Sequence, residues 1–231
     1  KLSTGPVWCG AVSWYDQQSN GVRGLMGHDK LFQKRKAELS RKVNTRFLRR
    51  ILIVCEGEKT EPNYFKCFPQ NPLVFDAIDI KGTGYNTVSL VREAIRLKGL
   101  ADNDSKPFIE VWCVFDKDSF SSKNFMEAIR LANTYAIKCA YSIEAFELWY
   151  ILHFDYCDAA LSRTQYKEML TERLGKPYTK NSEEMYGLLE SKQKNAVKNA
   201  KKLFEQQKAF PCYQQNPVTT VFRLVEKLRG E

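Results

Sequence analysis

The sequence feature that most limits the fold is a regular alternation between short apolar runs and amphipathic segments. Residues 51–55 form a continuous apolar run, and residues 108–115 form a second apolar run in which Glu110 is the one charged residue; both are rich in β-branched and aromatic side chains. This pattern is typical of strands that are buried on both faces of a parallel sheet. Weaker strand patterns cover residues 75–80 and 137–141. The sequence therefore predicts four strands.

Helical spacing of apolar residues separates these strands. Segments starting near Thr60, and at 87–98, 123–135 and 143–154, follow the four strands in turn. Such alternation predicts an α/β domain with a mostly parallel four-stranded sheet flanked by helices. From Leu161 onward the pattern is helical, with one long helix expected at 183–207 and a last one at 219–228.

Composition along the chain suggests four regions. Residues 1–25 have no helical or alternating period, so we predict that they are an extension outside the fold. Residues 26–48 form a predicted basic arm, because residues 30–50 hold nine Lys or Arg against the single acid Glu38. Such an arm either contacts a phosphate backbone or is a solvated leader. Residues 49–160 are the predicted α/β core, and 161–231 a helical part packed on it.

Charge and cysteine usage restrict partners and compartment. The formal net charge of +9 attracts polyanions, so nucleic acid is a predicted partner. No apolar run approaches the roughly 20 residues of a transmembrane helix, so no membrane contact is expected. Seven cysteines, an odd number without a CxxC pair, indicate reduced thiols in a cytoplasm. With only two histidines, any metal has to be held mainly by carboxylates.

Acidic residues follow two of the predicted strands at the point where each strand ends. Glu56 follows the first strand, and Asp116 and Asp118 follow the third. The carboxyl ends of parallel strands face a common crevice. Carboxylate oxygens are the ligands that Mg²⁺ and Mn²⁺ prefer, so these three residues are the predicted metal ligands. The alternative for each acid is a cap on the next helix.

Four motifs resemble those of the RloB family, Toprim-like bacterial proteins linked to phage defence. They are VCEGEKTE (54–61), FDKD (115–118), SIEAFELW (142–149) with His153-Phe154, and NPVTT (216–220). The resemblance covers about residues 49–228 and implies a Toprim-like fold with an acidic metal site. It departs at Ile143-Glu144, where a small polar residue is expected after Ser142, and this leaves the role of that position open.

Further residues are weaker candidates for the site. Glu147 is predicted as a fourth acidic catalytic group, with a surface acid as the alternative. His153, between two apolar residues, is interpreted as a hydrogen-bonded core histidine. Lys59 either contacts a phosphate or is a plain surface lysine. A basic helical face that includes Lys198, Lys201 and Lys202 either tracks nucleic acid or is solvated.

The functional hypothesis is a metal-dependent nuclease that cleaves phosphodiesters. Glu56, Asp116 and Asp118 would hold Mg²⁺ or Mn²⁺, and Glu147 would be a further catalytic acid. The resemblance to Toprim nucleases implies RNA, such as transfer RNA, or DNA as substrate, and an ATPase as protein partner. The alternative is a non-catalytic module that binds an ATPase or a nucleic acid. A primase-like or topoisomerase-like enzyme ranks below both.

Overall fold

The computed structural model describes residues 34–35, 48–117 and 121–231. Residues 47–231 form one compact unit. Of residues 1–46 only Lys34 and Arg35 are described, and both are helical and exposed. The predicted extension at 1–25 lies outside the described residues, as does nearly all of the predicted basic arm. Asp118 also lies outside them.

The sheet has four strands, and all of its pairs are parallel. The strands are β1 (Arg50–Cys55), β2 (Ala77–Gly82), β3 (Phe108–Lys117) and β4 (Lys138–Ile143), in the order β2-β1-β3-β4. In this order β1 and β3 are central, which agrees with the five consecutive buried apolar residues in each of them. The predicted α/β class with a parallel four-stranded sheet is confirmed.

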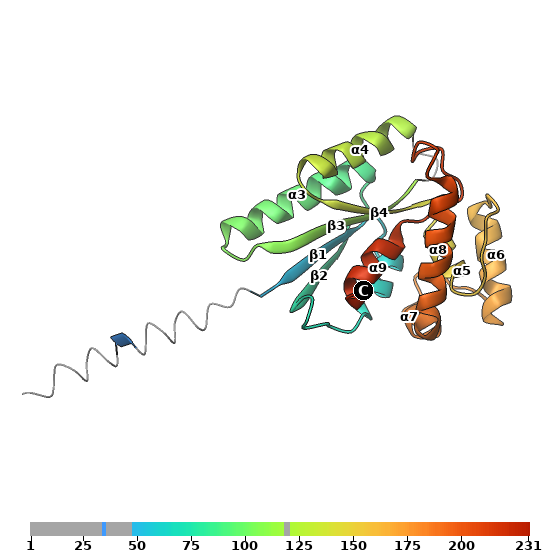
Figure 1. Cartoon of the computed structure of the whole chain (residues 1–231), viewed down its shortest axis with the longest axis horizontal. Helices are drawn as coiled ribbons and strands as arrows, with labels where there is room; N and C mark the ends of the chain where they lie inside the picture. Colours follow the sequence, from blue (N-terminus) through green and yellow to red (C-terminus); the bar gives the residue numbers. More distant parts are fainter. Residues whose placement is uncertain (1–33, 36–47, 118–120) are drawn as a thin grey trace, which may run out of the picture. The chain divides into compact units, whose positions relative to one another are not determined.

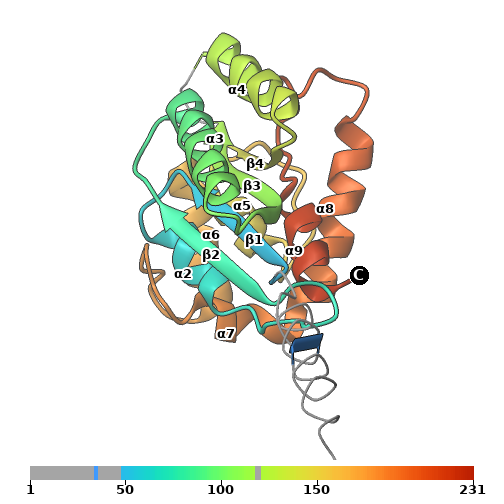
Figure 2. The ribbon, with the colours of Figure 1, turned by 90° about the vertical axis from the view of Figure 1, so that its left-hand side faces the viewer.

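Helices cover both faces of the sheet (Figure 1). α3 and α4 lie on one face, and the helices that follow β4 lie on the other, together with α2 (Figures 1 and 2). The helices on the two faces are α2 (Thr60–Lys66), α3 (Thr87–Asn103), α4 (Ser122–Thr134), α5 (Glu147–Ile151), α6 (Arg163–Leu174), α7 (Met185–Leu189), α8 (Gln193–Gln207) and α9 (Val221–Arg229).

Two hydrophobic clusters hold these layers together. Ile51, Ile53 and Cys55 point into the cluster shared with α2 and the C-terminal helices. Leu52 and Val54 point into the cluster shared with α3 and α4. Successive strand residues face opposite sides of a sheet, so a strand buried on both sides needs an unbroken apolar run. The C-terminal helices thus complete the core of the same unit as the sheet.

A short segment before α9 occupies the outer edge of β4. Thr219 forms an antiparallel bridge with Ser142, and their hydroxyls lie 3.0 Å apart. The backbone amide of Thr220 donates to the carbonyl of Tyr141 at 2.7 Å, and the Thr220 hydroxyl accepts from the Tyr141 amide at 2.8 Å. Because these groups satisfy the edge of β4, the segment extends the sheet by one bridge.

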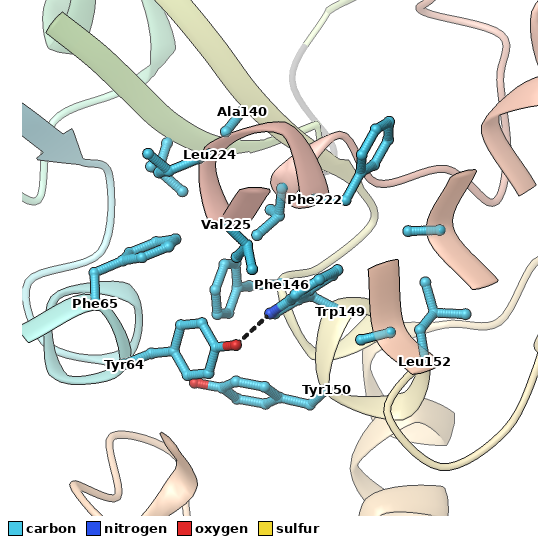
Figure 3. Packing of buried hydrophobic residues seen from close by; sticks show 14 of the residues in the cluster. Tyr64, Phe65, Ala140, Phe146, Trp149, Tyr150, Leu152, Phe222, Leu224 and Val225 are labelled. Carbon is cyan, nitrogen blue, oxygen red and sulfur yellow. Dashed lines mark hydrogen bonds between the residues drawn. The ribbon is translucent and has the colours of Figure 1, made fainter. Parts of the chain in front are cut away.

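The hydroxyl of Tyr64 connects three helices inside the first cluster, and Figure 3 shows its hydrogen bond with Trp149. Tyr64 lies on α2 and is 1% exposed. Its oxygen accepts hydrogen bonds from Trp149 Nε1 on α5 at 2.9 Å and from Gln193 Nε2 on α8 at 2.7 Å. A buried donor without an acceptor is costly, so this hydroxyl stabilises the packing of α2 against α5 and α8.

Several predicted boundaries were wrong. The second strand lies at 77–82 instead of 75–80, and the last helix begins at Val221 instead of Thr219. The helix predicted at 143–154 begins only at Glu147, because Ile143 continues β4 and Glu144 has a positive φ of 73°. The long helix predicted at 183–207 is interrupted by a 3-10 turn at Glu190–Lys192.

No helix in the described part of the chain is long and apolar enough to cross a membrane.

Tyr64→Phe tests the hydrogen-bonding role of the Tyr64 hydroxyl. The change leaves Trp149 Nε1 and Gln193 Nε2 without an acceptor, and we expect the free energy of unfolding to fall by about 2 to 4 kcal/mol. Urea denaturation measures this quantity. Tyr135→Phe is the matched control, because Tyr135 is 47% exposed and its variant should stay within about 0.5 kcal/mol of the wild type. Equal stability of the two variants would contradict this role.

Candidate acidic site at the strand ends

The first two predicted metal ligands lie side by side at the carboxyl ends of β1 and β3. The backbone amide of Glu56 donates to the carbonyl of Val114 at 2.9 Å, which holds the residue after β1 beside β3. The backbone amide of Asp116 in turn donates to Glu56 Oε2 at 3.1 Å. The parallel pairing of β1 and β3 therefore brings Glu56 and Asp116 together.

Besides Glu56, Asp116 contacts two other parts of the chain. Its Oδ2 accepts from the backbone amide of Phe146 at 3.2 Å and lies 3.7 Å from Arg163 Nη2. The Asp116 side chain is 17% exposed. The third predicted ligand, Asp118, lies outside the described residues, and its role stays a prediction.

Glu147 lies at the start of α5 and faces the same site. It is 3% exposed, and its Oε1 accepts a hydrogen bond from the Tyr178 hydroxyl at 3.2 Å. The neighbouring carboxylate of Glu147 raises the pKa of Tyr178, after the larger effect of burial. A glutamate buried this deeply is rare unless it is paired or functional. The structure thus places Glu147 with Asp116, although it does not test its predicted role.

Glu61, which the strand-end argument did not single out, is a further acid at the site. It lies in the first turn of α2 and is 5% exposed. Its Oε2 is buried and has no hydrogen-bond partner among the described residues. The only sequence signal was its place at the end of the motif that begins at Val54. The desolvation of such an oxygen is offset by a ligand, by a cation or by protonation of the carboxyl group.

Gly57 makes room for the Glu61 carboxylate. A Cβ atom at this position would lie 2.1 Å from Glu61 Oε2, far inside van der Waals contact. Any other residue would therefore displace the carboxylate. The Glu-Gly pair after β1 thus provides one acid and the space for a second one.

The acids raise one another's pKa values. Burial raises the pKa of Asp116 well above its usual range, and the charges of Glu61, Glu147 and Glu56 raise it further, while Arg163 lowers it. The pKa of Glu61 is raised by burial and by Glu147 and is lowered by its own backbone amide and by Lys180 and Arg163. In both pKa values the effects of burial and of the neighbouring acids therefore outweigh the opposing effects of the cations.

A cavity of about 370 Å³ joins these acids to the two cations. Glu61, Asp116 and Glu147 line it together with Arg163 and Lys180. Lys59 is exposed, directly precedes α2 and lines the same cavity. Its predicted phosphate contact remains a prediction.

The other predicted nucleic-acid-binding lysines are on α8 and do not belong to the described lining of this cavity. Lys198 is exposed, Lys201 forms an ion pair with Glu226, and Lys202 Nζ lies 4.0 Å from the ring centroid of Tyr156. All three are at the surface. Their predicted role is not tested by this placement.

His153 is a core histidine, which is the interpretation that the sequence favoured. It is fully buried, and its Nδ1 donates to the carbonyl of Trp149, 2.9 Å away. Burial lowers the pKa of its imidazole to about 4, against smaller opposing effects of its hydrogen bonds. The ring is therefore neutral at physiological pH and has a structural part in the packing around Tyr64.

The donor set of the cavity fits a hard divalent cation. The acidic residues that line the cavity offer carboxylate oxygens, which hard cations prefer. One of these oxygens, Glu61 Oε2, is buried and has no hydrogen-bond partner among the described residues. Among the described residues, no group of three or more His, Cys, Asp or Glu is already arranged as a metal site. Asp116 instead faces Arg163. A cation at this point would compete with the guanidinium.

The fold and the acidic cavity define the class of protein: a parallel α/β domain of the Toprim-like type with carboxylates at the strand ends. The sequence model of the RloB-like protein family matches residues 51–228. The chain therefore belongs to the RloB-like family, as the motifs indicated. No curated protein and no solved structure matched the chain.

Gly57→Ala tests the space reserved for Glu61. The added Cβ clashes with the carboxylate, and we expect the free energy of unfolding to fall by about 1 to 3 kcal/mol. In a Glu61→Ala background the same change should cost almost nothing, which a double-mutant cycle measures. Gly99→Ala is the control: nothing lies near its Cβ, and the helix of α3 should gain about 0.5 to 1 kcal/mol. An equal cost in both backgrounds would argue against the clash.

Glu61→Gln should stabilise the protein at neutral pH when divalent metals are chelated. Because the folded-state pKa of Glu61 is raised above its ordinary value of 4.5, ionisation costs the wild type stability as pH rises through that folded value. The Glu61→Gln side chain does not ionise, so the variant keeps this stability as the pH rises. Its advantage should be on the order of 1 kcal/mol at pH 8 and should disappear near pH 4.

Urea denaturation at the two pH values measures the difference between wild type and Glu61→Gln. Exposed Glu183 gives the matched control, Glu183→Gln, which should change stability little at either pH. A Glu61→Gln variant that is less stable than the wild type at pH 8 would show that the carboxylate is not under strain.

Proposed function

We propose that this chain is a metal-dependent nuclease of the Toprim type that hydrolyses phosphodiester bonds in RNA or DNA. The observation that supports the proposal best is the convergence of Glu61, Asp116 and Glu147 in one cavity, where burial and mutual repulsion raise the pKa values of Asp116 and Glu61. Such accumulation of buried negative charge is costly in a fold and is common at functional sites.

In this proposal Glu56 and Asp116 hold Mg²⁺ or Mn²⁺, with Asp118 as the third ligand predicted from the sequence. When bound, the ion would activate water and stabilise charge on the phosphorus centre and the leaving oxygen. Glu147 would be a further catalytic acid, and Glu61, which lines the same cavity, would add a carboxyl group to the site. Water would add to phosphorus, the bond from phosphorus to the leaving sugar oxygen would break, and the leaving oxygen would receive the proton that the water loses.

The wider setting is carried over from the family resemblance. It includes anti-phage defence, an ATPase partner, and transfer RNA as one candidate substrate, while the cytoplasmic location is proposed from the cysteine usage. The positive net charge of +9 agrees with a nucleic-acid substrate. A non-catalytic module that binds an ATPase or a nucleic acid is the rival function, and the same experiment separates the two.

Cleavage of end-labelled total RNA and of plasmid DNA, with Mg²⁺ or Mn²⁺ and with EDTA, tests the nuclease proposal. We expect metal-dependent products from the wild type. Glu56→Gln and Asp116→Asn should each lower the rate by at least about 100-fold, because each removes a charge that acts on the reacting centre. The substrate that is cut identifies the class of nucleic acid.

The controls are isosteric changes of exposed acids. Asp102→Asn on α3 and Glu183→Gln before α7 remove the same charges from exposed residues outside the cavity lining, and both variants should cleave at the wild-type rate. Absence of products with either metal, or products that persist in Glu56→Gln and Asp116→Asn, would favour the non-catalytic module.

A further inference from the structure

Lysines gather on the outer face of α8 and on the turn before it. Residues 192–202 contain no acidic side chain, and their lysines are Lys192, Lys194, Lys198, Lys201 and Lys202. Lys192 is half-buried and the other four are exposed. The inner face of the helix is buried against the core through Gln193, Ala196, Val197, Ala200 and Leu203. The lysines therefore place a row of positive charge at the surface.

The loop that follows α5 lies along this helix. Asn199 Nδ2 donates to the carbonyl of Leu152 at 2.9 Å, and the Tyr156 hydroxyl donates to Gln206 Oε1. Phe154 and Tyr156 are half-buried and pack against the hydrophobic cluster that α2 shares with the C-terminal helices. Because two hydrogen bonds fix the loop on α8, both rings are held at the surface beside the lysines.

Two of the lysines cover the rings of this loop. Lys192 Nζ lies 4.0 Å from the ring centroid of Phe154, and Lys202 Nζ lies 4.0 Å from that of Tyr156. Both distances are within the roughly 6 Å of a cation–π contact. Positions 192 and 202 are about 15 Å apart along a helix axis. Rings and cations thus share one strip, which we call the α8 surface: Phe154, Tyr156, Lys192, Lys194, Lys198 and Lys202.

Acids around the α8 surface neutralise its charge only in part. Three nearby acids are already engaged in other ion pairs, which are Glu205 with Lys208, Glu226 with Lys201 and Asp155 with Arg173. No ion pair within the described part of the chain includes a lysine of the α8 surface. With Glu190 and Asp158 close to it in sequence, the surface keeps an excess of positive charge.

Positive charge beside aromatic rings suits single-stranded nucleic acid. Its phosphates form the polyanion that lysines attract, and its unstacked bases present flat faces to aromatic side chains. In a duplex the neighbouring base pairs cover these faces, so that only the backbone and the groove edges are accessible. An acidic polypeptide likewise offers charge without bases. The combination of rings and lysines therefore favours a single strand over both.

The two cation–π contacts are weak enough for a base to replace them. An exposed contact of this kind shifts an equilibrium about two- to fivefold, whereas stacking of one base on an aromatic side chain strengthens binding about five- to 150-fold. A lysine that leaves its ring loses the smaller effect, and its flexible four-carbon stem lets the ammonium reach a phosphate instead. Exchange of Lys192 and Lys202 from rings to phosphates is therefore favourable.

We propose that the α8 surface binds a single-stranded segment of the nucleic-acid substrate, with bases stacked on Phe154 and Tyr156 and with the lysines on its phosphates. The inference rests on the proposed function and deepens it, because it names the form of the substrate. The loop follows the C-terminal end of α5, and Glu147 at the other end of this helix lines the acidic cavity. With five residues, α5 is about 8 Å long. The bound segment therefore lies one short helix away from the cavity.

Fluorescence anisotropy with labelled strands of about 12 nucleotides tests the proposal, since protein sites for single strands cover about 4 to 16 nucleotides. RNA and DNA of one sequence are compared with a hairpin duplex and with an abasic DNA strand of the same length. All titrations contain EDTA, so that no metal-dependent cleavage takes place. We expect the wild type to bind RNA, DNA or both about tenfold more tightly than the hairpin and the abasic strand. The tighter of the two single strands identifies the preferred sugar.

Tyr156→Leu and Tyr156→Phe form a matched pair. Both variants lose the hydrogen bond to Gln206, but only leucine removes the ring. We expect Tyr156→Leu to bind the preferred single strand about fivefold more weakly than the wild type, and Tyr156→Phe to bind it equally well. Phe154→Leu and Phe154→Tyr should differ in the same way. Binding of the abasic strand should not change in these four variants, because it has no bases to stack.

Lys192→Gln and Lys202→Gln test the phosphate contacts. Each variant should bind the base-bearing and the abasic strand about fivefold more weakly at about 0.1 M salt, and its dependence on log salt should fall by about 0.7. Lys106→Gln is the matched control, because Lys106 is exposed in the turn between α3 and β3 and does not belong to the α8 surface. This control should bind every probe like the wild type.

Three results would overturn the inference. The first is equal binding of the base-bearing and the abasic strand by the wild type, or of the single strand by Tyr156→Leu and Tyr156→Phe. The second is displacement of the strand by polyglutamate at the same charge concentration as by unlabelled strand, which would indicate an acidic protein as partner. The third is weaker binding only in variants whose unfolding temperature is also lower, which would show a structural role.

Failure of the α8 surface and failure of the nuclease function give different results. Cleavage that depends on Glu56 and Asp116, together with wild-type binding by the ring and lysine variants, would contradict the α8 surface alone. Binding that depends on the rings and lysines, without cleavage of any substrate, would contradict the nuclease function alone.

Discussion

The constraint on which the rest of this structure depends is the burial of β1 and β3 on both faces of the sheet. Five consecutive residues of each strand are buried. Neither strand can shift along the other without exposing apolar side chains on both faces, so the register between them is fixed. Since Glu56 and Asp116 follow these runs directly, the same packing that forms the core also sets the positions of the acids relative to each other.

The helices on the C-terminal side of the sheet add a second level of constraint. α2 carries Glu61 and α5 carries Glu147, and the Tyr64 hydroxyl holds these two helices together through Trp149. The buried hydrogen bond and the aromatic contacts around it stabilise an arrangement that electrostatic repulsion between the carboxylates opposes. In this way a well-packed apolar cluster offsets the cost of an unfavourable polar site, as is common where residues are kept for chemistry and not for stability.

The sequence predicted the structure best where burial or strand direction alone determined the position of a residue. Continuous apolar runs identified the central strands, and the rule that strand ends converge placed Glu56 beside Asp116. The strand β2 was displaced by two residues because its residues are only partly buried and its pattern is weak. The start of α5 was missed because Ser142 and Ile143 suit a strand or a helix equally, and the positive φ of Glu144 depends on tertiary contacts. Periodicity alone cannot distinguish such cases.

The site itself was predicted in part, for a similar reason. The strand-end rule considers only residues that directly follow a strand, whereas Glu61 reaches the cavity from the first turn of a helix five positions later. Arg163 and Lys180 were not singled out, since nothing local marks a cation that approaches from a distant helix and loop. Tertiary packing brings these residues together, and neither spacing nor composition records it.

The pairing of Thr219 and Thr220 with the outer edge of β4 has a consequence for how the protein behaves in a crowded solution. Unpaired strand edges are templates on which other chains can add strands, and they are a common origin of aggregation. Here one edge of the sheet is occupied by the protein's own chain. Among the described strands β2 forms the other edge, and it is short and carries the charged residues Asp79 and Lys81. The paired end of β4 and the charged residues of β2 therefore both disfavour the addition of a strand from another molecule.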